Sequence, residues 1–277
     1  MAALFALSGA LLWGVGDFLG GIASRRISVL TVLAVSQAVG LAGLVLWIVL
    51  ANDPFPGAVE LLPGVAAGLA GLIGLGALYR GLSIGAMGVV APISAAGPVV
   101  PLAIDAARGI VPSPLQWLGV VLVLAGIASL SLEQPASGPR RLAEGAGLAI
   151  VAALGFGAFF VGIDSAADES VPWAVGAARS AAVVVAFGAV AVTSAPLTPP
   201  RALLPALVGV GAFDTGANVS VAFATTEGAV GIVAILSALY PIVTVVLARL
   251  FLLEELSRGR RLAAAAALAG AAFVAAG

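Results

Sequence analysis

The chain has 277 residues, of which 62% are hydrophobic and 9% are charged, and its formal net charge is −1. Soluble domains carry about 25% charged residues, so this composition, with a mean hydropathy of +1.20, is typical of a membrane protein. The absence of cysteine and histidine excludes disulfides, thiolate metal sites and histidine bases, and the low net charge excludes a nucleic-acid-binding surface.

Ten apolar stretches follow one another along the chain, and each is long enough for a helix that crosses a bilayer, which needs about 20 apolar residues. The predicted helices are residues 3–22, 29–50, 61–80, 86–105, 114–131, 142–163, 172–193, 203–222, 229–249 and 260–276. The longest break, residues 133–141, separates a first five-helix unit, residues 1–135, from a second, residues 136–277. Ser113 followed by Pro114 predicts an N-cap at the start of the fifth helix.

The second unit repeats the first in sequence. Residues 13–24 (WGVGDFLGGIAS) align with residues 154–165 (LGFGAFFVGIDS), with six of twelve positions identical. Residues 85–100 align with residues 228–243, with nine of sixteen positions identical. Because each unit has an odd number of predicted helices, the second must enter the membrane from the opposite side. The sequence therefore predicts an all-α integral membrane protein of ten transmembrane helices in two inverted repeats, an arrangement typical of secondary transporters.

The placement of arginine predicts an orientation, because cytoplasmic loops are enriched in basic residues. Only Arg108 borders an even-numbered loop. The arginines that border odd-numbered loops are Arg25, Arg26, Arg80, Arg140, Arg141, Arg201, Arg249, Arg258, Arg260 and Arg261. We therefore expect the odd-numbered loops to be cytoplasmic, both termini to lie outside, and the protein to reside in the cell (inner or plasma) membrane.

Several short motifs occur in order along the two units. They are Trp13-Gly14, residues 79–85 (YRGLSIG), residues 89–92 (VVAP), residues 239–241 (LYP) and residues 251–257 (FLLEELS). Together they resemble the EamA-type members of the drug/metabolite transporter superfamily. This resemblance implies a 5+5 inverted repeat, a central cavity lined mainly by helices 1, 3, 4, 6, 8 and 9, and movement of amphipathic metabolites. The chain departs from the family where Gly109 is followed by Ile110 instead of glutamate, and where Leu253 replaces a glycine.

Two carboxylates lie inside predicted apolar helices, where a charge costs at least about 2.5 to 3.5 kcal/mol. Asp17 lies about 20 Å into the first helix. It is interpreted either as a site for a proton or a substrate cation, or as a carboxylate that meets water near the helix end. Asp214 lies near the middle of the eighth helix, with Asn218 one turn further on the same face. This pair predicts a proton and substrate site, and the alternative is a hydrogen-bonded clamp between helices.

Arg179 lies about seven residues into the seventh predicted helix and aligns with Gln37 in the second. The sequence leaves three interpretations of Arg179 open. It could pair with Asp214 or Asp17, bind a substrate carboxylate through two hydrogen bonds, or extend toward the lipid headgroups. We include Arg179 and Gln37 in the candidate substrate site.

Other candidate residues are aromatic residues close to the cavity-lining positions of the family, and prolines that interrupt the fourth and ninth helices. The aromatic residues are Trp13, Tyr79 and Tyr240. The prolines are Pro92, Pro98 and Pro241. The aromatic residues are interpreted as cavity lining or as ordinary packing, and the prolines as hinges or as fixed kinks.

Taken together, these features predict a secondary active transporter that moves a small metabolite or amphipathic compound by alternating access, with efflux coupled to proton antiport through Asp214 and Asp17. The alternatives are an uncoupled facilitator or exchanger, an integral membrane enzyme for lipid-linked substrates, and a non-transporting scaffold. The enzyme is disfavoured because histidine and an Asp-x-x-Asp pair at a helix end are absent. We expect no cofactor, metal or nucleic acid. The expected partners are the substrate, protons and membrane lipids, with the protein a monomer or homodimer.

Overall fold

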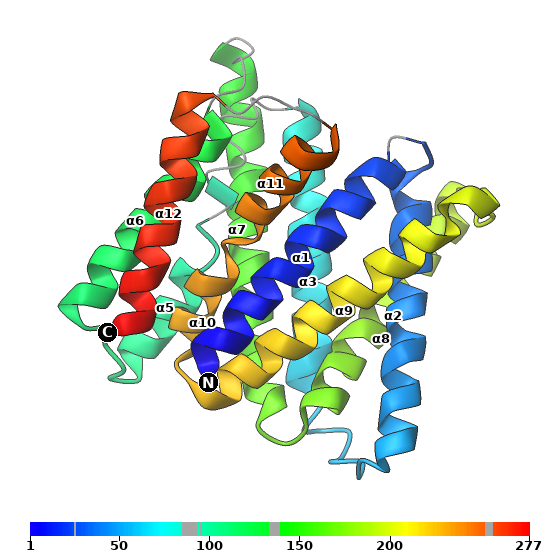
Figure 1. The fold of residues 1–277 in the computed structure, drawn as a ribbon. Coiled ribbons are helices and arrows are strands. Elements are labelled where there is room, and N and C mark those ends of the chain that lie inside the picture. The colour runs from blue at the N-terminus through cyan, green and yellow to red at the C-terminus, as the bar shows by residue number, and fades with distance from the viewer. Residues whose placement is uncertain (25, 85–92, 95, 133–138, 253–256) are drawn as a thin grey trace.

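A computed structural model describes residues 1–24, 26–84, 93–94, 96–132, 139–252 and 257–277. Within these residues the chain folds as a bundle of α-helices without strands (Figure 1). The helices are α1 (Ala2–Ser24), α2 (Val29–Ala51), α3 (Leu62–Ile84), α5 (Val99–Ala107), α6 (Pro114–Leu132), α7 (Pro139–Ala167), α8 (Val171–Thr193), α9 (Leu204–Glu227), α10 (Val230–Ser237), α11 (Tyr240–Leu252) and α12 (Arg258–Ala276), with a 3₁₀ turn at Arg201–Leu203.

Helices that can cross a membrane dominate the described part of the chain. Six segments are long and apolar enough to do so, and three further apolar helices are shorter. The six are Ala2–Ser24, Val29–Ala51, Gly145–Ala167, Val171–Thr193, Arg201–Glu227 and Val230–Leu247. The prediction of an all-α membrane protein is confirmed, whereas the count of ten spanning helices and the unit boundaries stay predictions. The N-cap at Ser113 is confirmed, because the Gln116 N–H donates to Ser113 Oγ at 3.2 Å.

The prediction of one continuous helix over residues 229–249 is wrong, because the segment is divided into α10 and α11. The Ala238 N–H still bonds to Ala234, but the next bonds are shorter turns, and α11 begins at Tyr240. Pro241 has no N–H to continue the ladder and fits the first turn of a new helix. Pro98, 143 residues earlier, directly precedes α5 in the same way. Pro92 lies outside the described residues.

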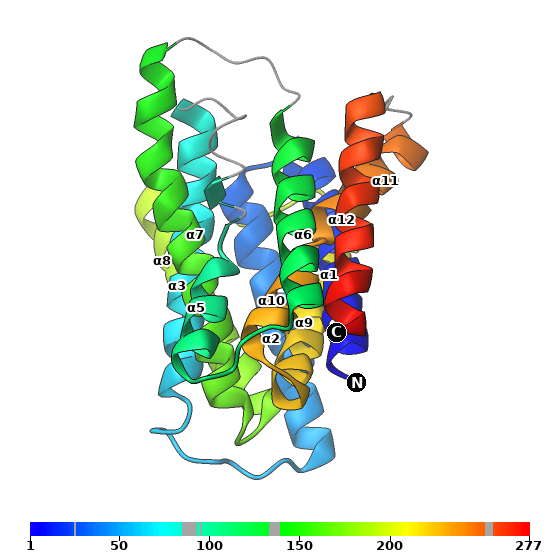
Figure 2. The same ribbon diagram turned by 90° about the vertical axis from the view of Figure 1, so that its left-hand side faces the viewer.

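The helices alternate in direction between two ends of the bundle. In Figures 1 and 2, both chain termini lie at one end, which we name the termini end. The opposite end, where α1 finishes and α9 and α12 begin, carries Arg26, Arg201 and Arg258 and is named the arginine end. The helix α1 runs toward the arginine end, whereas α7, which opens the second unit, runs away from it. The two units therefore have opposite directions in the bundle.

The contacts between helices are exchanged when the two units are exchanged. The contact of α1 with α9 corresponds to that of α7 with α3, and the contact of α2 with α9 corresponds to that of α8 with α3. The contact of α1 with α11 likewise corresponds to that of α7 with α5, while α6 packs on α12 and α2 packs on α8. Together with the opposite directions, this exchange is the arrangement expected of an inverted repeat.

Close crossings set the register between the two units. A Cβ added to Gly14 would lie 2.8 Å from Val243 Cγ1, and one added to Gly157 would lie 2.6 Å from Val100 Cγ2. Both members of the second contact are 143 residues from their counterparts in the first. The sequence alignment instead paired Gly14 with the glycine two positions before Gly157 and is corrected by this packing. Two residues turn a helix by about 200°, so the correction changes which residues face the centre.

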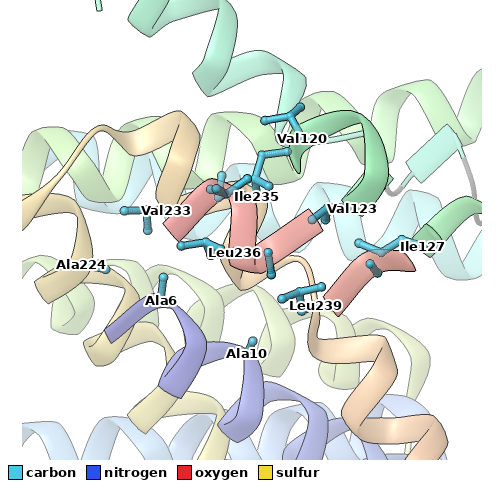
Figure 3. Close-up of a cluster of buried hydrophobic side chains, with 14 of the residues drawn as sticks. Ala6, Ala10, Val120, Val123, Ile127, Ala224, Val233, Ile235, Leu236 and Leu239 are labelled. Carbon is cyan, nitrogen blue, oxygen red and sulfur yellow. The ribbon is translucent and has the colours of Figure 1, made fainter. Parts of the chain in front are cut away.

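The hydrophobic core lies mainly in the half of the bundle near the termini end. Its largest cluster surrounds α10, where Val233, Ile235 and Leu236 are fully buried or nearly so. Figure 3 shows these side chains between Ala6 and Ala10 of α1 and the valines of α6. Two small clusters of three buried residues each lie toward the arginine end. Among the described residues, the two units are thus packed together most extensively at the termini end.

Candidate functional site

The centre of the bundle contains an ion pair between α8 and α9. Arg179 Nη1 donates hydrogen bonds to Asp214 Oδ2 and to Gln37 Oε1 of α2. Arg179 lies eight residues, or about 12 Å, after the start of α8, and Asp214 lies ten residues, or about 15 Å, after the start of α9. The Arg179 side chain is 3% exposed and the Asp214 side chain is 30% exposed. The structure therefore shows the pairing with Asp214, not an arginine that extends to the headgroups.

Glycines allow the helices around this ion pair to approach at backbone distance. A Cβ added to Gly211 of α9 would lie 2.6 Å from the Ser36 carbonyl oxygen of α2. Side chains larger than hydrogen at this position would separate the two helices. Small residues at such crossings are common in membrane bundles, where backbone proximity strengthens packing. The glycine thereby places Gln37, next to Ser36, within reach of Arg179.

One donor of the buried arginine is unused. Arg179 Nη2 is fully buried and has no hydrogen-bond acceptor among the described residues, and the same holds for Thr215 Oγ1. A buried polar group without a partner costs about 1 to 3 kcal/mol. The guanidinium could therefore accommodate one further acceptor if the surrounding helices rearranged.

Asp17 of α1 lies beside this ion pair. A Cβ added to its neighbour Gly16 would lie 3.6 Å from Asp214 N, and the two carboxylates interact electrostatically. No described residue forms a hydrogen bond or ion pair with the Asp17 carboxylate. The Asp17 residue is exposed to solvent, although protein atoms surround it on most sides.

The helical register shows what the exposed Asp17 faces. Asp17 follows Ala6, Ala10 and Trp13 by eleven, seven and four residues, so all four lie on one face of α1. Ala6 and Ala10 on this face are buried in the core, whereas Leu4 and other leucines on the opposite face are exposed. Asp17 therefore faces the interior of the bundle, not the lipid.

The three charged groups leave the centre with an excess negative charge. Arg179 compensates Asp214, so the Asp17 carboxylate has no compensating cation among the described residues. A charge inside a membrane must be paired, hydrated or neutralised by a proton. The arrangement can therefore take up a proton or a positively charged group at Asp17.

Aromatic residues form the next layer toward the termini end. Trp13 Nε1 donates a hydrogen bond to Asn218 Oδ1 at 3.1 Å. The Trp13 ring meets Phe160 and Tyr240 edge-on, with ring centroids 6.1 and 6.2 Å apart. Asn218 thus pairs with Trp13, while Asp214 pairs with Arg179, and the predicted acid and amide have separate partners. The side chain of Tyr79 lies outside the described residues.

The charged centre has no counterpart in the other repeat. At the packing register of 143 residues, Asp17 corresponds to Phe160 and Asp214 corresponds to Gly71. The sequence analysis overlooked Phe160, and the corrected register is the signal that would have identified it. The polar site therefore belongs to one side of an otherwise repeated bundle.

The fold and the charged centre define a membrane protein built from two inverted, mutually packed units around polar groups. The family model described as the EamA-like transporter family matches residues 1–132 and 143–276, and the chain belongs to this family. The predicted resemblance is thus confirmed. The protein is a multi-pass membrane transporter of the drug/metabolite type, and members of this family are transporters, not enzymes.

Comparison with solved structures supports the fold alone. A crystal structure whose description names no activity is 18% identical to the chain and superposes with a TM-score of 0.81. The match covers 98% of this chain and 95% of the other. No curated protein matches the sequence.

Proposed function

We propose that this transporter is a secondary active exporter, which moves a small amphipathic metabolite out of the cell in exchange for protons. The observation that carries the proposal is the uncompensated Asp17 carboxylate, which faces the interior of the bundle beside the Arg179–Asp214 ion pair. A carboxylate in this position can be neutralised either by a proton or by a positively charged substrate group. Because one carboxylate serves both, each ligand displaces the other.

The exchange gives the ion pair a distinct role. Arg179 holds Asp214 ionised and fixed, so the pair sets the local charge while Asp17 changes its occupant. A proton that arrives from outside would neutralise Asp17 and then leave to the cytoplasm. The substrate would bind to the ionised Asp17 from the cytoplasm and be released outside when the next proton binds. Asp214, which the sequence analysis placed first, thereby supports Asp17 instead of exchanging protons itself.

The aromatic layer suits the apolar part of such a substrate. Trp13 lies one turn from Asp17 on the same face of α1, and its ring contacts Phe160 and Tyr240. Aromatic faces attract cations and pack against apolar groups. The proposed substrate therefore combines a positively charged group with an apolar body.

The direction of transport follows from the two ends of the bundle. The arginine end is proposed to be cytoplasmic by the positive-inside rule. The extensive core at the termini end then corresponds to a state that is closed toward the outside. Export from this state begins with substrate that enters from the cytoplasm.

Proton release on binding tests the proposal. Purified protein in weakly buffered detergent solution would be mixed with pooled amino acids, nucleosides or quaternary ammonium compounds, and a pH indicator would record proton release. We expect release from the wild type, loss of release in Asp17→Asn, and release as in the wild type for the exposed control Glu227→Gln. Binding without proton release in the wild type would show an uncoupled facilitator or exchanger.

A further inference from the structure

A second carboxylate within a predicted membrane helix joins the two repeats at the termini end. Asp105, near the end of α5, is 2% exposed, and its Oδ2 accepts a hydrogen bond of 2.7 Å from the backbone N–H of Gly231. Gly231 lies in the first turn of α10, where backbone N–H groups have no partner within their own helix. The bond therefore connects the first unit directly to the second.

The helices α5 and α10 approach closely at this bond. A Cβ added to Gly231 would lie 2.7 Å from Leu102 Cα, so the two backbones are in contact. Leu102 is itself 5% exposed and belongs to the main hydrophobic cluster. At the same end, Arg108 of the first unit forms an ion pair of 3.4 Å with Asp164 of α7. The ion pair is largely exposed, so it contributes little, and the buried Asp105 bond is the stronger link.

The bond has no equivalent in the sequence of the other repeat. The residue 143 positions after Asp105 is Ala248, which has no carboxylate, although Gly231 corresponds to another glycine, Gly88. In an inverted repeat, the outward-open and inward-open states exchange the roles of the two units. A carboxylate present in one unit only therefore stabilises one of the two states.

We propose that Asp105 is a gating residue, whose hydrogen bond to Gly231 holds the transporter closed at the termini end. This proposal rests on alternating access, and in that cycle the contact of α5 with α10 separates whenever the termini end opens. The bond favours the state closed at that end. Asp105 positions helices and does not contact the substrate.

The size of the effect follows from the strength of the bond. Hydrogen bonds to charged groups contribute enough to shift a two-state equilibrium by about tenfold to a hundredfold. Removing the acceptor should increase the population that is open at the termini end by the same factor. The change appears without substrate or protons, because the bond is internal to the protein.

Cysteine accessibility measures this population directly, because the chain contains no native cysteine. The reporter is Leu102→Cys, which lies at the contact of α5 with α10. Its rate of labelling by N-ethylmaleimide would be compared between the reporter protein with its native Asp105 and the same protein carrying Asp105→Asn, Asp105→Ala or Asp105→Leu. A second reporter, Val111→Cys, is at a residue that is 65% exposed and controls for changes in reagent access.

We expect Asp105→Ala to increase labelling of Leu102→Cys about tenfold or more, and Asp105→Asn, which keeps an acceptor oxygen, to leave the rate close to that with the native aspartate. Asp105→Leu retains the side-chain volume without an acceptor and should match Asp105→Ala, so a folded variant remains if the alanine protein unfolds. Unchanged labelling in both the alanine and the leucine variants would overturn the proposal. Absence of proton coupling would leave this test unaffected, which separates it from the proposed antiport.

Discussion

Removing either partner of the central ion pair should have unequal effects on stability. Asp214→Leu leaves Arg179 buried without a counter-charge, since its side chain is only 3% exposed. Breaking a buried ion pair in this way costs about 3 to 5 kcal/mol. Arg179→Met instead leaves Asp214, which is 30% exposed and can be hydrated or protonated, so we expect a loss of about 1 to 3 kcal/mol.

The double variant completes the thermodynamic cycle. With both charges gone, neither is left uncompensated, and the double variant should lose less stability than the two single variants together. Unfolding by SDS in mixed micelles would be followed by the fluorescence of the four tryptophans. Arg201→Met, at an exposed arginine, serves as the control and should change stability by less than about 0.5 kcal/mol.

Two results would refute this reasoning. Greater destabilisation by Arg179→Met than by Asp214→Leu would mean that the arginine is not the more deeply buried partner. Equality between the double variant and the sum of the single variants would mean that the two groups do not interact.

Two further predictions concern packing and capping. A Cβ at Gly119 would lie 2.5 Å from the Gly270 carbonyl oxygen, so Gly119→Ala should destabilise the protein by about 1 to 3 kcal/mol. Gly43→Ala meets nothing within 4 Å and should leave the melting temperature unchanged, and equal melting temperatures for both variants would contradict the close crossing. Ser170 caps α8 and donates to Asp53 Oδ2 at 2.7 Å, so Ser170→Ala should cost about 1 kcal/mol and accelerate amide exchange at the start of α8. Unchanged exchange there would show that the cap is dispensable.

The sequence predicted most helices because the bilayer leaves few alternatives for a long apolar segment. It missed the division between α10 and α11 because hydropathy stays high through the break. Pro241 was recognised as an interruption, but a proline can kink a helix or start a new one. Only the packing of Tyr240 and Ala238 decides between these outcomes.

The central pairing was predicted as one alternative among three. Arg179 and Gln37 were aligned as equivalent positions, and in the structure they contact each other, as equivalent residues do when two inverted units face each other near their axis. The sequence could not select Asp214 over Asp17 as the partner, because that choice depends on the crossing of α8 with α9. Asp105 was overlooked because a single carboxylate near a predicted helix end resembles an ordinary solvated residue.

The measurement that tests the central claim most directly is efflux driven by a pH gradient. Proteoliposomes would be loaded with a labelled compound that releases protons in the binding screen, and the external solution would then be acidified. The proposal predicts that acidification accelerates efflux through the wild type, and that Asp17→Asn abolishes this acceleration. Efflux through the wild type that is independent of the gradient, or gradient-driven efflux that persists in Asp17→Asn, would contradict the proposal.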